Sequence, residues 1–396
     1  GYRSDENVLE SMAVSTQDRY DIDHFAETPS NGILSDIWNA WYNGIYRCND
    51  VLDHMAGAKI ANYDKYRGEC LFLRSWWYFN LYRVFGVVPV TRTVVAPAAA
   101  KLIPRCTEEE MYTLLTEDLS EAARLLPSTP GAEKGRVANI AAYTLLAKVY
   151  LTFGKPAEAK TALEEAMKNT AYGLESTTGK AFDVGNKMNK EIIFALYYNK
   201  TNDNGHGYWY SANTDVLADI NNPTPTFKAI YDGDKDNRLP LISTYTKISS
   251  NLFAMTKWYD TYDATYTTQV GNDFPHLRYA DVVLMYAEAL AESGGSLGDA
   301  LVWLNKTRTR AGLDALKAED IPSKGAFIEA LADERGREFA LEGHRWFDLV
   351  RLGLALDRFH EMGYKLDAHN LLFPIPQNQI EIVNNPSILW QNPGFN

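Results

Sequence analysis

The chain has 396 residues, and its 51 acidic residues outnumber its 39 basic residues, which gives a formal net charge of −12 at pH 7. This charge argues against a nucleic-acid partner, because nucleic-acid binding depends on neutralising phosphates with basic side chains. Apolar residues make up 46% of the chain, enough for a large core, yet the apolar runs are far shorter than the roughly 20 residues of a membrane-spanning helix.

The ends and the cysteines give little direct information. The chain begins at Gly1 without an initiator methionine or an apolar leader, so we expect any targeting segment to lie outside this sequence. Cys48, Cys70 and Cys106 are an odd number without close pairing, and we expect buried thiols rather than a disulfide framework or zinc ligands.

Helical periodicity dominates the first part of the chain. Trp38, Trp41, Ile45 and Leu52 lie at helical spacing within 37–55. A weaker helical pair is formed by 67–84 and 109–126. We therefore expect an N-terminal helical scaffold over 36–171.

The clearest pattern is a helical hairpin over 137–167, with its turn at 154–156. Small residues on this hairpin let the two helices approach closely where they cross. The spacing is close to that of a tetratricopeptide repeat, and it is carried by Tyr143, Leu146, Ala147, Tyr150, Gly154, Ala159, Leu163 and Ala166.

The segment 172–277 has little helical period and many Gly, Asn, Asp, Thr and Tyr residues. It is too long to be a plain connection. The runs 192–198 and 239–245 favour β structure. We expect an irregular insertion with short β-hairpins, folded on the scaffold.

A second hairpin like that at 137–167 starts at Tyr279, and 326–343 with 344–356 forms a further helical pair. About four such pairs would stack into a curved scaffold, since one hairpin cannot bury its own apolar faces. The tail, 358–396, contains four prolines and should be extended. We predict a mainly α, tetratricopeptide-like single unit: scaffold 36–171, insertion 172–277, helical pairs 278–357 and tail 358–396.

Within 339–351, four residues follow the spacing i, i+4, i+7 and i+11 and are expected to bury one stripe. Phe339, Gly343, Trp346 and Val350 would form this stripe, with Gly343 permitting close helix contact. The expected ion pairs at i,i+3 spacing are Glu342 with Arg345, and Asp348 with Arg351.

Six segments spread over most of the chain resemble the SusD-like (SusD/RagB) family. The two strongest are RYADVVLMYAEA at 278–289 and RGREFALEGHRWFDLVR at 335–351. The others are WNAWYNGIYRCN at 38–49, LRSWWYFNLYRVFGVVP at 73–89, FPIPQNQ at 373–379 and QNPGF at 391–395.

The resemblance implies a lipid-anchored protein of the outer membrane, at the cell surface of Gram-negative bacteria. Such a protein binds a nutrient, usually a glycan, and delivers it to a SusC-like TonB-dependent transporter; it is not an enzyme. The lipid-bearing cysteine expected near the mature start is absent, and Gly1 enters just before the first tryptophan-bearing helix, so the anchor is inferred from the resemblance alone.

Within the insertion, one aromatic cluster has the composition of a sugar-binding site, which needs flat rings with amide or carboxylate groups at their edges. Tyr208, Trp209 and Tyr210 follow a glycine-flanked loop that carries Asp203 and Asn204. On a strand, Trp209 would face away from the two tyrosines. We predict these five residues as ligand contacts, the alternative being that the rings cover the scaffold.

Four further contacts are predicted elsewhere. Tyr259 and Tyr262 belong to a second aromatic cluster, in which Trp258 is expected to be buried. Arg3 and Asp5 lie in the loop before the first tryptophan-bearing helix, from which sites of the family also draw.

No metal or cofactor is predicted. Asp232, Asp234 and Asp236 alternate as in a calcium loop, but Asn237 and Ser243 stand where that loop requires Gly and Glu. The seven histidines show no metal spacing, and the chain lacks a phosphate-binding glycine loop and a nucleophile elbow.

Three other functions stay open. A RagB-type member would keep the fold and bind oligopeptides. A glycoside hydrolase would use acidic residues of the insertion. Glu338 and Glu342 are a separate candidate for a catalytic carboxylate pair, but Arg335, Arg337 and Arg345 are expected to keep both ionised. A tetratricopeptide adaptor for a protein tail would have no use for the aromatic insertion.

Overall fold

A computed structural model describes residues 3–9, 17–198, 211–213, 223–247, 252–260 and 271–395. Helices dominate this part of the chain and its strands are short, so the predicted mainly α class is confirmed. None of the described helices is both long enough and apolar enough to cross a bilayer.

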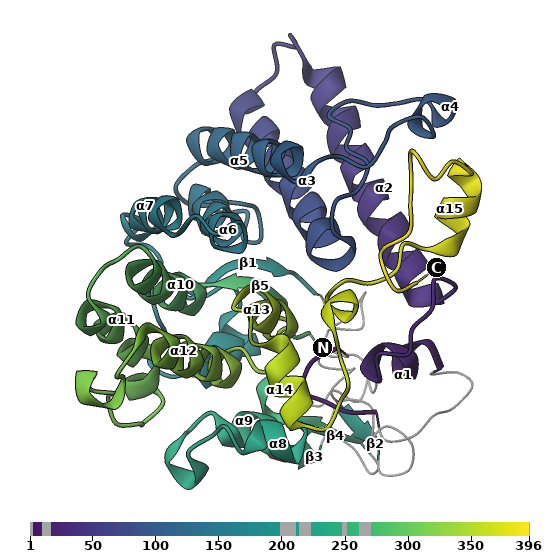
Figure 1. Ribbon diagram of the computed structural model, residues 1–396. Coiled ribbons are helices and arrows are strands. Elements are labelled where there is room, and N and C mark those ends of the chain that lie inside the picture. The colour runs from purple at the N-terminus through teal and green to yellow at the C-terminus, as the bar shows by residue number, and fades with distance from the viewer. Residues whose placement is uncertain are drawn as a thin grey trace.

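The long helices form a curved row, each packed on the next, and Figure 1 shows this row around a central β-ribbon. Consecutive helices pack because each carries apolar residues on more than one face. In packing order they are α2 (Gly32–Met55), α3 (Tyr63–Phe85), α5 (Glu108–Leu125), α6 (Asn139–Thr152), α7 (Pro156–Met167) and α10 (Tyr279–Glu292), followed by α11 (Leu297–Arg310) and α12 (Lys324–Glu338).

Local sequence signals set the ends of these helices. Thr107 caps α5 in a reciprocal capping box with Glu110. Gly154 turns the chain between α6 and α7 with a φ of +66°, and Pro156 begins α7. The predicted hairpin over 137–167 is therefore confirmed, and its alanines at the helix crossing, including Ala147, are fully buried.

Helix α10 lies between two hydrophobic clusters. Val282, Met285 and Ala289 pack in the cluster built mainly from α2 to α7, whereas Leu284 and Ala287 pack with α11 and α12. All five side chains are fully buried. Because both of its faces are covered, α10 joins the N-terminal helices to the C-terminal pairs.

The polar residues of segments 278–289 and 335–351 meet each other in the interior. These ion pairs are almost completely shielded from solvent. They join Arg278 to Glu338 and Glu342, Asp281 to Arg335, and Glu288 to Arg351. A buried charge is tolerated only when it is paired, so these residues hold the C-terminal helices in register.

The predicted pair 326–343 with 344–356 is confirmed as two helices, but the predicted buried stripe does not lie on one helix. Helix α12 ends at Glu338, and α13 (Arg345–Arg351) begins after Leu341 and Gly343, which have φ values of 63° and 77°. A Cβ on Gly343 would have no atom within 4 Å, so this glycine provides a left-handed backbone and not a close helix contact.

Because α12 ends at Glu338 and α13 begins at Arg345, one of the two predicted ion pairs is not formed. Glu342 binds Arg278 and Lys257, whereas Arg345 binds Asp5, so the predicted Glu342–Arg345 pair is wrong. The predicted pair Asp348–Arg351 is confirmed, with an Oδ1–Nη2 distance of 2.8 Å.

Replacing Gly343 by alanine is expected to destabilise the protein by about 1–2 kcal/mol, because a side chain disfavours the left-handed backbone at this position. Thermal unfolding measures the change, with Gly325→Ala in the first turn of α12 as the control. Equal melting temperatures for the two variants would contradict the assignment of Gly343 as a conformational break.

The described part of the insertion forms a ribbon and a small sheet. β1 (Ile192–Leu196) pairs antiparallel with β5 (Phe274–Arg278), and β4 (Leu252–Met255) lies between β2 (Ser211–Asn213) and β3 (Tyr245–Lys247). The predicted strand over 192–198 is thus confirmed for its first five residues. The strand expected over 239–245 is wrong, because Pro240 starts a short helix, α9 (Leu239–Ser243), whose Ile242 is buried beside Trp258.

The tail is less extended than predicted. Its first residues belong to α14 (Ala355–Glu361), and it contains α15 (Gln377–Val383), which Figure 1 shows beside α2. Pro376 precedes α15 directly and so begins a helix where we expected it to prevent one. The remaining α-helices are α1 (Gln17–Asp23), α4 (Pro97–Ala100) and α8 (Pro225–Lys228).

Candidate functional site

The structure describes only three of the nine predicted ligand contacts. Tyr259, Arg3 and Asp5 are among the described residues. The other six, Asp203, Asn204, Tyr208, Trp209, Tyr210 and Tyr262, lie outside them. The site is therefore built here from its described surroundings.

One end of the β1–β5 ribbon combines an exposed ring with a charged pair. Tyr197, directly after β1, is 56% exposed, and the Lys187 ammonium lies 4.6 Å from its ring centroid. Lys187 Nζ also donates to Asp273 Oδ1 at 2.8 Å and to the Tyr198 carbonyl at 2.7 Å. We call Lys187, Tyr197, Tyr198 and Asp273 the ribbon end.

Asp273 holds Lys187 and the backbone of Tyr198 together at the ribbon end. Its Oδ1 accepts from the Tyr198 backbone N–H at 2.9 Å as well as from Lys187. Its Oδ2 has no hydrogen bond within the described residues, and Lys187 links this carboxylate to the exposed ring of Tyr197. Such a ring with an acceptor at its edge is suited to the apolar face and the hydroxyls of a sugar.

A second set of contacts anchors the segment that contains Tyr259. Asn272 Nδ2 donates to the Tyr259 carbonyl at 3.2 Å, and Asp260 Oδ2 accepts from the Gly271 N–H at 2.7 Å. The Tyr259 side chain is half-buried, and Trp258 is fully buried, as predicted for Trp258. These contacts lie just before and just after 261–270, which contains Tyr262.

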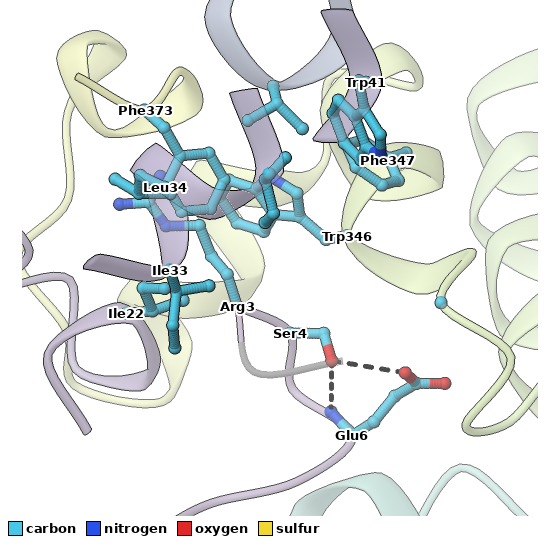
Figure 2. A pocket seen from close by; sticks show the side chains of 13 residues that line it. Arg3, Ser4, Glu6, Ile22, Ile33, Leu34, Trp41, Trp346, Phe347 and Phe373 are labelled. Carbon is cyan, nitrogen blue, oxygen red and sulfur yellow. Dashed lines mark hydrogen bonds between the residues drawn. The ribbon is translucent and has the colours of Figure 1, made fainter. Parts of the chain in front are cut away.

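The predicted ligand contacts Arg3 and Asp5 of the N-terminal segment are both buried. Asp5 is buried and accepts from Arg345 with both oxygens, at 2.9 and 2.7 Å, so its carboxylate is part of an internal ion pair. Arg3 is buried, pairs with Glu27 and lies over the ring of Phe373 at 3.9 Å (Figure 2). The sequence could not show this, because Arg345 is 340 residues away from Asp5.

The sequence analysis also missed Tyr197, Lys187 and Asp273. The usable signal was the pair of tyrosines at the end of the β-favouring run 192–198, since a ring at the free end of a strand has nothing to cover it. Lys187 and Asp273 gave no such signal, because their contact spans 86 residues.

The carboxylates considered for catalysis are structural. Burial by itself would raise the pKa of Glu338, but Arg310, Arg278 and Arg238 together hold that pKa well below its usual range. Glu342 is bound by Arg278 and Lys257. The sequence analysis was therefore wrong about which cations keep Glu338 and Glu342 ionised, since it named Arg335, Arg337 and Arg345.

The described residues contain no group of three or more potential ligands arranged to hold a metal ion. Of the aspartates considered for calcium, Asp236 is buried and has both oxygens bound to Arg238. The three cysteines carry free thiols.

Comparisons with known proteins agree with this architecture. A family model described as "SusD family" matches residues 240–395, and one described as "Starch-binding associating with outer membrane" matches residues 2–151. The chain is 28% identical to the curated SusD-like protein P2 of Formosa agariphila, over 95% of this chain and 84% of that protein.

Two solved structures show the same fold. A SusD superfamily protein from Bacteroides vulgatus is similar with a TM-score of 0.82 and 24% identity, covering 99% of this chain and 92% of that one. A structure named as a laminarin-binding SusD-like protein is similar with a TM-score of 0.79 and 25% identity, covering 100% of this chain and 93% of that one.

Proposed function

Because the chain is a SusD-like protein, we propose that it binds a glycan at the ribbon end and passes it to a TonB-dependent transporter of the outer membrane. The observation that carries the binding site is the exposed ring of Tyr197 beside the ammonium of Lys187, which is paired with Asp273. Glycan binding is also supported by the name of the laminarin-binding neighbour and by the starch-binding description of the N-terminal family model.

The predicted aromatic contacts remain part of this proposal through their position in the sequence. Tyr208, Trp209 and Tyr210 belong to the segment that starts after Tyr198 of the ribbon end and leads into β2. Tyr262 belongs to the segment between Asp260 and Gly271, which are hydrogen-bonded to each other. In the sequence, the first segment thus follows Tyr198, whose N–H is bound by Asp273, and the second follows Asp260 and precedes Gly271.

Outer-membrane association is supported by the description of the same family model. The lipid anchor and the SusC-like transporter belong to the proposal. A protein that delivers cargo should release it readily, so we expect micromolar to millimolar affinity, as two or three stacked rings and a few hydrogen bonds would give.

Replacing Tyr197 by alanine is expected to weaken glycan binding about two- to tenfold, because one stacking ring is lost. Calorimetry with laminarin oligosaccharides, followed by a wider panel of polysaccharides, measures the affinity. Trp209→Ala tests the predicted cluster in the same way. Tyr46→Ala is the control, because Tyr46 is comparably exposed (52%) but lies on α2.

An unchanged affinity of Tyr197→Ala in a confirmed glycan binder would move the site away from the ribbon end. Binding of oligopeptides and of no glycan would favour the RagB-type function. New reducing ends after incubation with an oligosaccharide would show catalysis and overturn a purely binding role.

A further inference from the structure

A half-open cavity of about 520 Å³, which we call the α3–α13 cavity, lies where α3, α5, α6 and α13 meet the tail. Its apolar wall residues are Val87, Phe347, Val350 and Leu372. The same wall contains Arg83, near the C-terminal end of α3. None of the lining residues belongs to the ribbon end, so the cavity is a separate feature from the proposed glycan site.

Arg83 is a half-buried cation without a carboxylate partner. Its Nη2 donates to Asn80 Oδ1 at 2.6 Å, and its guanidinium carbon lies 4.1 Å from the ring centroid of Phe347, which also lines the cavity. Among the described residues, no carboxylate forms an ion pair with it. Nε is enclosed without an acceptor, whereas Nη1 also lacks an acceptor but keeps accessible surface. The guanidinium therefore has a donor left for a ligand.

The charges behind Arg83 balance one another without it. Three cations and three carboxylates pair there: Lys148 and Arg335 with Asp281, Arg335 and Arg351 with Asp348, and Arg351 with Glu288. Burial lowers the pKa of Arg83 to about 10, although Asp348 and Asp281 partly oppose this from a distance. Arg83 is thus a surplus cation at neutral pH. Because a charge withdrawn from water is tolerated only when it is paired, its counter-charge should come from the cavity.

A second charged group limits the ligand to a single negative charge. Glu108 lines the cavity, and its Oε1 accepts from the Tyr82 hydroxyl at 2.6 Å. Glu108 is exposed, so water screens its repulsion of a monoanion. A doubly charged phosphate would leave one charge without a partner and would be repelled more strongly. A carboxylate matches one surplus guanidinium, and a hydrogen bond between two such charged groups is a strong one.

The size and the apolar walls define the rest of the ligand. A cavity of about 150 Å³ holds one benzene ring, so the α3–α13 cavity has room for more than one ring. A free inorganic ion would leave Val87, Phe347 and Leu372 facing empty space or water. The walls therefore favour an organic acid whose ring packs against them.

We propose that the α3–α13 cavity binds a monocarboxylate that carries a six-membered ring. The carboxylate accepts from Arg83 Nη1, and the ring lies against Phe347 and Val87. A sugar acid and an aromatic acid share this chemistry, since both place one carboxylate on a ring with an apolar face. The site does not depend on glycan binding at the ribbon end.

Benzoate and methyl glucuronide, each titrated at millimolar concentration and followed by saturation-transfer NMR, are the two probes. Arg83→Met should weaken acid binding about ten- to a hundredfold, the range of one hydrogen bond to a charged group. Benzamide and methyl glucoside lack the charge, so they should bind more weakly and be insensitive to Arg83→Met. Arg47→Met, at an exposed arginine of α2, is the matched control. Binding of one acid alone would identify the source of the carboxylate.

Arg83→Met breaks no ion pair, so its melting temperature should stay close to that of the parent. Glu108→Gln provides a second variant with the opposite sign. It removes a negative charge from the cavity while glutamine still accepts from Tyr82, and it should strengthen acid binding about two- to fivefold at low salt. The proposal is overturned if neither acid binds the parent, if Arg83→Met binds both acids as tightly as the parent, or if Glu108→Gln does not strengthen binding.

Discussion

Replacing Arg278 by methionine is expected to lower the free energy of unfolding by about 3–5 kcal/mol, the usual cost of removing one partner of a buried ion pair. Arg278 is 1% exposed and binds Glu191, Glu338 and Glu342 through its guanidinium. Methionine fills a similar volume but leaves carboxylates short of a cation. The stability loss therefore reports on charge and not on a cavity.

Urea and thermal unfolding measure this loss, and Arg124→Met is the control, because the Arg124 side chain on α5 is 70% exposed. The control should change stability by less than about 0.5 kcal/mol. If Arg278→Met unfolded at the same urea concentration as the control, the buried ion pairs could not be what holds the C-terminal helices together.

Replacing Glu6 by glutamine should stabilise the protein at neutral and alkaline pH. Burial raises the pKa of Glu6 to about 7. The hydrogen bond that Glu6 accepts from the Leu341 N–H lowers the pKa, but it offsets only part of the effect of burial. Between about pH 4.5 and 7 the folded state thus retains a proton that the unfolded state has lost. Stability contributed by this group falls as pH rises through that window, by up to about 1.4 kcal/mol per pH unit.

At pH 8, Glu6→Gln should therefore be more stable than the parent by roughly 2–3 kcal/mol, whereas at pH 4 the two should be alike. Glutamine can keep both contacts, because its oxygen accepts from Leu341 and its amide donates to Ser4. The test is the melting temperature of both proteins from pH 4 to 8, with the exposed Glu319→Gln as control. A constant difference across this range would show that Glu6 does not titrate there.

These two predictions concern the same property of the chain. Its most family-like segments, 278–289 and 335–351, supply buried ion pairs rather than ligand contacts. The N-terminal segment is connected to these ion pairs through Asp5, which binds Arg345. Its Asn7 also forms an isolated antiparallel β-bridge with Pro223 of the insertion. The residues that identify the family and those proposed to bind glycan are thus different residues.

The sequence was a good guide wherever the determining information is local. Hairpin α6–α7 and helices α10 and α11 follow from apolar spacing and from turn residues such as Gly154 and Pro156, since helical hydrogen bonds join residues four apart. The pair Asp348–Arg351 could be predicted for the same reason. The predicted burial of Trp258 is also confirmed, although Trp258 packs against distant residues such as Ala340 and Leu341. The proposed contacts at Tyr208, Trp209 and Tyr210 stay predictions.

Tertiary structure decided what depends on distant partners. Helix α12 stops before Leu341, whose N–H is bound by Glu6, 335 residues away, and Glu342 pairs with Arg278 and not with its neighbour Arg345. The ribbon end and the α3–α13 cavity likewise assemble residues from separate segments. A sequence pattern records the preferences of neighbouring residues, whereas the partner of a buried charge is set by which segments the folded core brings together.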